Sequence, residues 1–177
     1  MNSRDAEALV TLIILIFVFA IILTPIIALW VYIILQNGKR KRIRERILAA
    51  RADVIGNKRW FPARYAGQQR FHSFFKILPW EGAGIFVVAP GSVLYLGEML
   101  NGTPVTLQFA PGNSRINWLG KCPWPNGAGS WLRFDTADQK DYFNSETGIM
   151  IFGSHASTKA IYDEANKDFG APAAQNI

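Results

Sequence analysis

The hydrophobic pattern divides the chain into one long apolar run followed by many short apolar segments. The run extends from Ala8 to Leu35 and contains no charged residue, histidine, asparagine or glutamine. As a helix it would measure roughly 42 Å, against about 30 Å of hydrocarbon in a bilayer. Backbone polar groups in lipid must bond to one another. The pattern therefore predicts a single transmembrane helix over residues 8–35, after a short external tail at 1–7.

Two features qualify this helix. Pro25 removes one amide donor and crowds the carbonyl of Ile21, so we expect a kink near Pro25, which Thr24 can ease by bonding back to the helix. A proline tolerated in a membrane helix is the plain interpretation, and a functional hinge is the alternative. Trp30 and Tyr32 lie near one end, where amphipathic rings prefer the interface. A cleaved signal peptide fits less well, because the run is too long and the basic residues follow it.

A basic block follows the apolar run directly. It contains Lys39, Arg40, Lys41, Arg42, Arg44, Arg46 and Arg51. Ile43, Ile47, Ala50 and Val54 recur at helical spacing, which predicts a basic amphipathic helix over residues 36–56. We expect Gly38 to separate it from the membrane helix, so that it lies on the membrane surface. A stop-transfer signal and a helix that binds headgroups or a partner are both open as its role.

The position of this block predicts the topology. Basic residues stay on the cytoplasmic side, so the N-terminus is expected outside and residues 36–177 inside, at the inner (cytoplasmic) membrane. The membrane-interface residues would be Trp30, Tyr32, Lys39, Arg40, Lys41, Arg42, Arg44 and Arg46. Residues 39–80 contain 12 bases and two acids, whereas residues 81–177 contain six bases and nine acids, so the first of these stretches makes the net charge of the chain, +6, positive. Nucleic acid is therefore not expected as a partner.

Aromatic and basic residues alternate over residues 57–80, which we interpret as a linker. Beside a membrane such rings favour the interface, and Trp, Tyr and Arg also dominate protein–protein anchors. Packing against the following domain is the plainer alternative. His72 has no partner pattern and is interpreted as structural. The docking candidates are Trp60, Phe61, Arg64, Tyr65, Arg70, Phe74, Phe75 and Trp80.

From Glu81 the texture changes to short apolar runs separated by turn signals, which predicts six or seven antiparallel strands in a sandwich or barrel. Pro90-Gly91 predicts a type II turn and Asn101-Gly102 a hairpin. The last element, residues 155–170, has the spacing of an amphipathic helix, with Ser157 as a candidate N-cap. The predicted strands are 84–89, 93–99, 104–110, 115–120, 131–136, 141–145 and 148–154.

This order of elements resembles the pleckstrin-homology/GRAM-like superfold of bacterial membrane-anchored proteins. The resemblance covers residues 81–170 and is carried by "GAGIFVVAPGSVLYLGE", an aromatic-containing late strand and "STKAIYDEAN". It implies an antiparallel barrel closed by a C-terminal helix, and an association with membrane lipids or protein partners. In phosphoinositide-binding members, bases of the first two strands and their loop hold the headgroup. No base lies between Glu81 and Leu100, which argues against that site here.

Catalytic and cofactor motifs are not found in the sequence. His72, His155 and Cys122 lack metal-ligand spacing, and no phosphate-binding glycine loop follows a strand. We therefore expect no enzyme activity and no cofactor. The preferred hypothesis is an accessory subunit of a larger membrane complex, such as a respiratory or photosynthetic assembly, whose partners are integral membrane proteins. The alternative is a membrane-surface adaptor that binds anionic lipid headgroups through the basic helix and aromatic linker.

Overall fold

The computed structural model describes residues 3–123, 126–147 and 153–169. The chain divides into two compact units between Gly38 and Lys39. The helices and strands in chain order are α1 (Ser3–Ala50), α2 (Ala52–Ile55), β1 (Arg59–Gly67), α3 (Gln68–His72), β2 (Gly82–Ala89), β3 (Ser92–Met99), β4 (Pro104–Phe109), β5 (Arg115–Lys121), β6 (Ser130–Asp135), β7 (Lys140–Ser145) and α4 (His155–Phe169).

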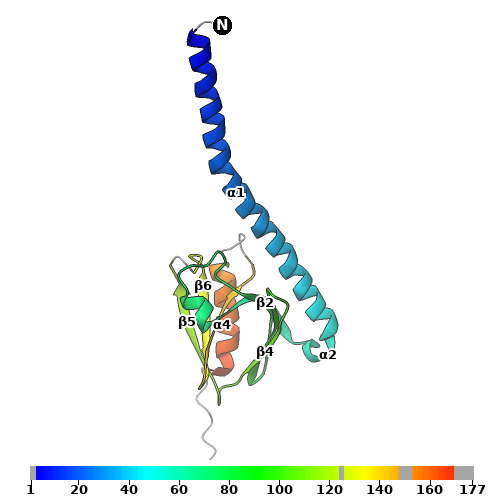
Figure 1. Ribbon diagram of the computed structural model, residues 1–177. Helices are drawn as coiled ribbons and strands as arrows, with labels where there is room; N and C mark the ends of the chain where they lie inside the picture. Colours follow the sequence, from blue (N-terminus) through cyan, green and yellow to red (C-terminus); the bar gives the residue numbers. More distant parts are fainter. Residues whose placement is uncertain (1–2, 124–125, 148–152, 170–177) are drawn as a thin grey trace, which may run out of the picture. The chain divides into compact units, whose positions relative to one another are not determined.

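The first unit is the apolar part of α1. Among the described residues, α1 is the one helix apolar and long enough to cross a membrane, with a mean hydropathy of 3.2 over its most apolar window. It continues through Pro25, and the hydroxyl of Thr24 donates to the carbonyl of Ala20 at 2.7 Å, as expected. Figure 1 shows a change of direction within the blue part of α1.

The predicted break at Gly38 is wrong, because α1 continues without interruption from Ser3 to Ala50. A glycine inside a helix costs only about 1 kcal/mol relative to alanine, which packing of the following turns can outweigh. The basic segment is therefore the last part of α1 rather than a separate helix. The predicted end does occur, since α2 ends at Ile55 and is followed by Gly56, its C-cap, which has a φ of +49°.

The second unit is built on one antiparallel sheet of seven strands, in the order β4-β3-β2-β1-β7-β6-β5. The six predicted strands that fall within the described residues are confirmed. The seventh, 148–154, falls mostly outside them. The sequence missed β1, which pairs with both β2 and β7 at the centre of the sheet, so the prediction that residues 57–80 form a linker is wrong.

Both predicted turns are confirmed by their glycines. Gly91 has a φ of +73° between the paired residues Ala89 and Ser92, and Gly102 has a φ of +97° in the β3–β4 hairpin. Side chains are also excluded where β2 meets β3. A Cβ at Gly84 would lie 2.1 Å from the carbonyl oxygen of Leu96, so the two strands approach too closely there for any larger residue.

The inner face of the sheet forms the main core, in which aromatic rings stack closely. Phe109 and Phe134 lie parallel at 4.1 Å between ring centroids, and Phe143 meets Phe86 edge-on at 4.6 Å. Helix α4 packs against this face through Ile161 and Ala165, as its spacing predicted (Figure 1). The hydroxyl of Ser154 accepts the amide of Ser157 at 3.3 Å. Ser154 is therefore the cap, and the prediction of Ser157 is wrong.

Candidate functional site

Two arginines of the basic segment turn toward the domain. Arg40 is 2% exposed, and its Nε lies 3.8 Å from Glu146 Oε1. One turn later Arg44 Nη1 lies 2.8 Å from Glu146 Oε2. The carboxylate of Glu146, directly after β7, thus bridges two cations of α1. The expectation that Arg40 and Arg44 face the membrane surface is wrong, because their guanidinium groups bind the domain.

Arg40 also stacks on the ring of Trp80, together with a second arginine, Arg64. The guanidinium carbons of Arg40 and Arg64 lie 4.7 and 4.4 Å from the centre of the Trp80 ring. Arg64, on β1, is fully buried, and Trp80 is 1% exposed. Burial, and then the proximity of Arg40, lowers the pKa of Arg64 to about 9, against the opposing effect of Glu146. Stacking on an aromatic face partly offsets the cost of burying such a charge.

The apolar stripe of the basic segment also faces the protein. Ile43 is 1% exposed, and Ile47 packs against a cluster formed by α2 and by the outer face of β2 and β3. That cluster consists of Ile55, Ile85, Val87 and Leu96. The helical spacing of these residues was predicted correctly, but the surface they meet is the sheet rather than lipid. Ala50, which was expected in the same stripe, is exposed.

The remaining cations of the segment are exposed to solvent. Lys41 and Arg42 are exposed, and Lys41 forms only a surface ion pair with Glu45 at 3.8 Å. Lys39 is also exposed, although its Nζ donates to the carbonyl of Leu100. Arg46 is 65% exposed and pairs with Glu98 of β3 at 2.9 Å. A basic block that looked uniform in sequence therefore separates into a buried set and an exposed set.

The predicted docking residues on β1 separate in the same way. Arg64 and Tyr65 are buried, and the Tyr65 hydroxyl donates to Asp141 Oδ1 at 2.9 Å. Burial, followed by the charge of Asp141, raises the pKa of Tyr65. Trp60 remains 39% exposed, and Phe61 is half-buried. Arg64, Tyr65 and Trp80 are therefore core residues. This agrees with the alternative that residues of this stretch pack against the following domain.

Because β1 precedes β2, the candidate headgroup loop lies earlier in the chain than the sequence indicated. The loop between the first two strands is residues 68–81, not 89–92, and it contains Arg70 and Lys76. Both side chains face inward. Arg70 Nη2 donates to the carbonyl of Leu78 at 2.8 Å, and Lys76 Nζ donates to the carbonyl of Phe71 at 2.7 Å. The absence of bases from residues 81–100 therefore does not argue against a headgroup site. The inward orientation of Arg70 and Lys76 does argue against one.

Residues 73–79, here called the aromatic loop, contain the three most exposed large apolar side chains among the described residues of the second unit. Phe75 is 91% exposed, Phe74 68% and Ile77 64%. The two phenyl rings meet edge-on at 5.2 Å, so they form one projecting group. Leu78, at the end of the loop, is 1% exposed and packs inward. Phe74 and Phe75 are thus the predicted docking residues that remain fully available.

The base of the aromatic loop is held by Lys76. Besides Phe71, its ammonium donates to the carbonyl of Arg70 at 2.9 Å and to Asn126 Oδ1 at 2.5 Å. The carbonyls of Arg70 and Phe71 end α3, so Lys76 satisfies the last turn of that short helix. Burial, and then the charge of Arg70, lowers the pKa of Lys76 to about 8.

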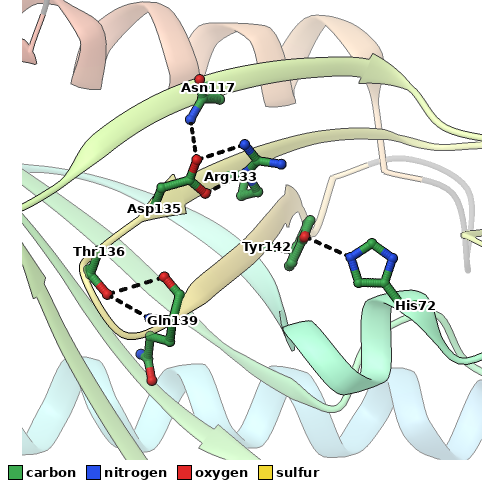
Figure 2. A network of polar contacts seen from close by, with 7 residues as sticks. All are labelled: His72, Asn117, Arg133, Asp135, Thr136, Gln139 and Tyr142. Carbon is green, nitrogen blue, oxygen red and sulfur yellow. Dashed lines mark hydrogen bonds and ion pairs between the residues drawn. The ribbon is translucent and has the colours of Figure 1, made fainter.

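A polar network on β5, β6 and β7 supports this region (Figure 2). Asp135 accepts from Asn117 at 2.9 Å and from Arg133 at 2.7 Å, which ties two strands together. His72, at the end of α3, lies 3.0 Å from the hydroxyl of Tyr142 on β7. The neighbouring Phe71 ring stacks on Tyr142 at 3.8 Å. His72 therefore fixes α3 to the sheet, in agreement with its interpretation as structural.

Reactive side chains are dispersed in the part of the chain that the structure describes. These residues contain no group of three or more His, Cys, Asp or Glu that could hold a metal. His155 Nδ1 lies 2.7 Å from Ser130 Oγ, a pair that the sequence did not suggest, but the other neighbour of the ring is Trp118 rather than a carboxylate. Cys122 is half-buried, and burial raises the pKa of its thiol.

Comparison with known proteins adds no relative. No protein-family model matches the chain, and neither the curated proteins nor the solved structures contain a match.

Proposed function

We propose that this protein is a non-catalytic accessory subunit of a larger membrane complex. The apolar part of α1 anchors it in the inner (cytoplasmic) membrane, with the N-terminus outside and the sheet domain in the cytoplasm. The domain docks on integral membrane partner subunits, and no cofactor is required. The asymmetry of basic residues around the apolar run supports this orientation.

One observation carries the proposal: the basic end of α1 is part of the core of the domain. Arg40 and Arg44 meet Glu146, Arg40 stacks on Trp80, and Ile47 packs on the sheet. A basic segment that packs into the domain suits a structural subunit. A lipid-reading adaptor would instead keep these cations free for headgroups, so this arrangement favours the subunit.

The fold supports a binding role rather than a chemical one. An antiparallel sheet with one C-terminal helix packed on its inner face supports the pleckstrin-homology/GRAM-like fold as part of this proposal. Such superfolds host many functions, so the role has to be argued from surfaces. Trp60 on β1, which remains partly exposed, offers an apolar anchor of the kind that interfaces use.

Native mass measurement after extraction in mild detergent tests the proposal. We expect stoichiometric recovery of the chain within a larger particle. The double variant Lys41→Gln with Arg42→Gln should leave that particle intact, because both side chains are exposed and outside the core. Recovery of the wild-type chain as a monomer whose bound lipid is anionic would contradict the subunit role.

The adaptor remains as a second candidate because one observation favours it. Lys39, Lys41, Arg42 and Arg51 are exposed on the basic segment, which begins four residues after the apolar run. Each base near an anionic leaflet adds roughly 1 kcal/mol of attraction. For an adaptor, the Lys41→Gln and Arg42→Gln double variant should lose anionic lipid from the purified protein, whereas a subunit should lose none of its partners.

A further inference from the structure

The aromatic loop presents an unusual combination of an apolar tip and a fixed base. Phe74, Phe75 and Ile77 are each more than half exposed, whereas the intervening Lys76 turns its charge back into the domain. A lysine in such a loop would normally extend into water. Here its ammonium has three oxygen acceptors, so the tip that projects carries no charge.

Several polar atoms of the loop are satisfied from within. The amide of Ser73 donates to Gln69 O at 3.1 Å, and its hydroxyl donates to Phe75 O at 3.4 Å. Arg70 donates to Leu78 O. An apolar phase imposes this requirement, because unpaired polar groups there cost several kcal/mol each. These bonds lower the cost of moving the loop out of water, because its one charged group already has oxygen acceptors within the domain.

An apolar phase also lies within reach of the domain. The second unit begins at Lys39, four residues after Leu35 ends the apolar run, and four residues span at most about 14 Å. A domain of this size has a radius of gyration of about 14 Å. If α1 spans a bilayer, the effective concentration of membrane interface around the domain is high, whereas a protein partner has to be recruited.

We propose that the aromatic loop inserts Phe74, Phe75 and Ile77 into the interfacial region of the bilayer that holds α1. The contact is apolar and does not depend on headgroup charge, because Arg70 and Lys76 are bound to carbonyl oxygens and do not reach phosphates. This gives the domain a second membrane contact besides its anchor. The inference needs the anchor but not the accessory-subunit role.

A lipid contact explains the loop better than a protein pocket does. Tyrosine, tryptophan and arginine dominate protein anchors because they combine apolar area with hydrogen bonds, and this tip contains none of them. Phenylalanine and isoleucine are among the residues that enter membranes most favourably. The two edge-on rings and Ile77 give the loop the composition of a membrane-inserting tip.

The test uses the full chain in nanodiscs, with Cys122→Ser and Phe75→Cys labelled with the environment-sensitive dye NBD. In phosphatidylcholine discs we expect blue-shifted emission, and loss of intensity when the acyl chains are brominated. Adding phosphatidylserine should not change the quenching. Thr106→Cys, exposed on β4, is the matched label site, and the same label with Phe74→Ser and Ile77→Ser should show less quenching than the parent.

The other outcomes separate this inference from the proposed function. An unquenched probe in every disc overturns the insertion, and quenching that needs phosphatidylserine overturns its charge-independent character. A probe unquenched in discs but shielded in the native complex assigns the loop to a protein partner, which overturns the insertion and leaves the subunit role standing. Quenching in discs together with a monomer in native extracts supports the insertion and contradicts the subunit role.

Discussion

Trp80 and Phe75 lie five positions apart in one basic, aromatic stretch, yet their surroundings are opposite. Trp80 is 1% exposed and contacts the guanidinium groups of Arg40 and Arg64. Phe75 is 91% exposed and touches little besides Phe74. The first ring belongs to the contact that joins the basic end of α1 to the sheet, and the second belongs to a tip that projects from it.

The difference teaches that residue type alone does not separate a core from a surface in this chain. Arginines beside aromatic rings form a buried stack in one place, and a lysine beside aromatic rings holds an exposed tip in the other. The partner of each cation determines whether the neighbouring rings lie in the core or at the surface. Arg40 and Arg44 bind a carboxylate and Lys76 binds carbonyls, so in neither region are these cations available to headgroups.

The largest expected effect follows from replacing the buried ring. Trp80→Ala should lower the free energy of unfolding by about 3–5 kcal/mol, the usual cost of deleting a buried tryptophan. Phe75→Ala should change it by less than about 0.5 kcal/mol, because an exposed side chain loses little packing. Urea unfolding of the full chain in detergent, followed by circular dichroism, measures both. Similar losses for the two variants would contradict the comparison.

A smaller effect is expected from the ion pairs. Glu146→Gln leaves Arg40 and Arg44 without their carboxylate in a buried position, and should lower the free energy of unfolding by about 2–4 kcal/mol. Glu45→Gln breaks only the exposed pair with Lys41, and should cost less than about 0.5 kcal/mol. The same urea titration compares them. If Glu146→Gln were as mild as Glu45→Gln, the basic segment would not be held by this carboxylate.

Much of the sheet could be predicted from the sequence, because period-two patterns and glycine turns act locally. The segments that became β2 to β7 alternate or form compact apolar runs, and Gly91 and Gly102 mark their turns. Strand β1 was missed because its "RWFPARYAG" carries two arginines and a proline. Pro62 is tolerated since pairing with β7 begins only at Ala63, which leaves the missing amide donor outside that ladder.

The joint between α1 and the sheet could not be predicted, because its determinants are distant in sequence. Nothing near Arg40 indicates that Glu146 will be its partner, and Arg64 reaches Trp80 only once β1 is placed at the centre of the sheet. A run of basic residues after a membrane segment is already explained by membrane topology. The sequence therefore gives no sign that some of these residues also pack against the domain. The exposed loop was recognised as aromatic, but its inward lysine required the fold.

The loop itself should respond modestly to the loss of its lysine. Lys76→Met keeps the aliphatic stem and removes three hydrogen bonds, one of them to Asn126. We expect a loss of about 1 kcal/mol, since desolvation of the ammonium offsets part of the gain. Lys140→Met, exposed on β7, is the matched control. Faster amide exchange confined to the α3 end and the loop would support the holding role, and unchanged exchange would contradict it.

The smallest expected effect on stability concerns a buried acid on β7, the strand that pairs with β1. Asp141 is 1% exposed, and burial raises its pKa against the hydrogen bonds from Tyr65 and Gln139. The folded state therefore holds this proton more tightly than the unfolded state does. As pH falls toward the unfolded pKa, wild type should gain unfolding free energy relative to Asp141→Asn, which cannot titrate. Urea unfolding of both chains between neutral and mildly acidic pH measures the difference. A gap that stays constant, or that shifts in favour of Asp141→Asn on acidification, would mean that the hydrogen bonds outweigh burial.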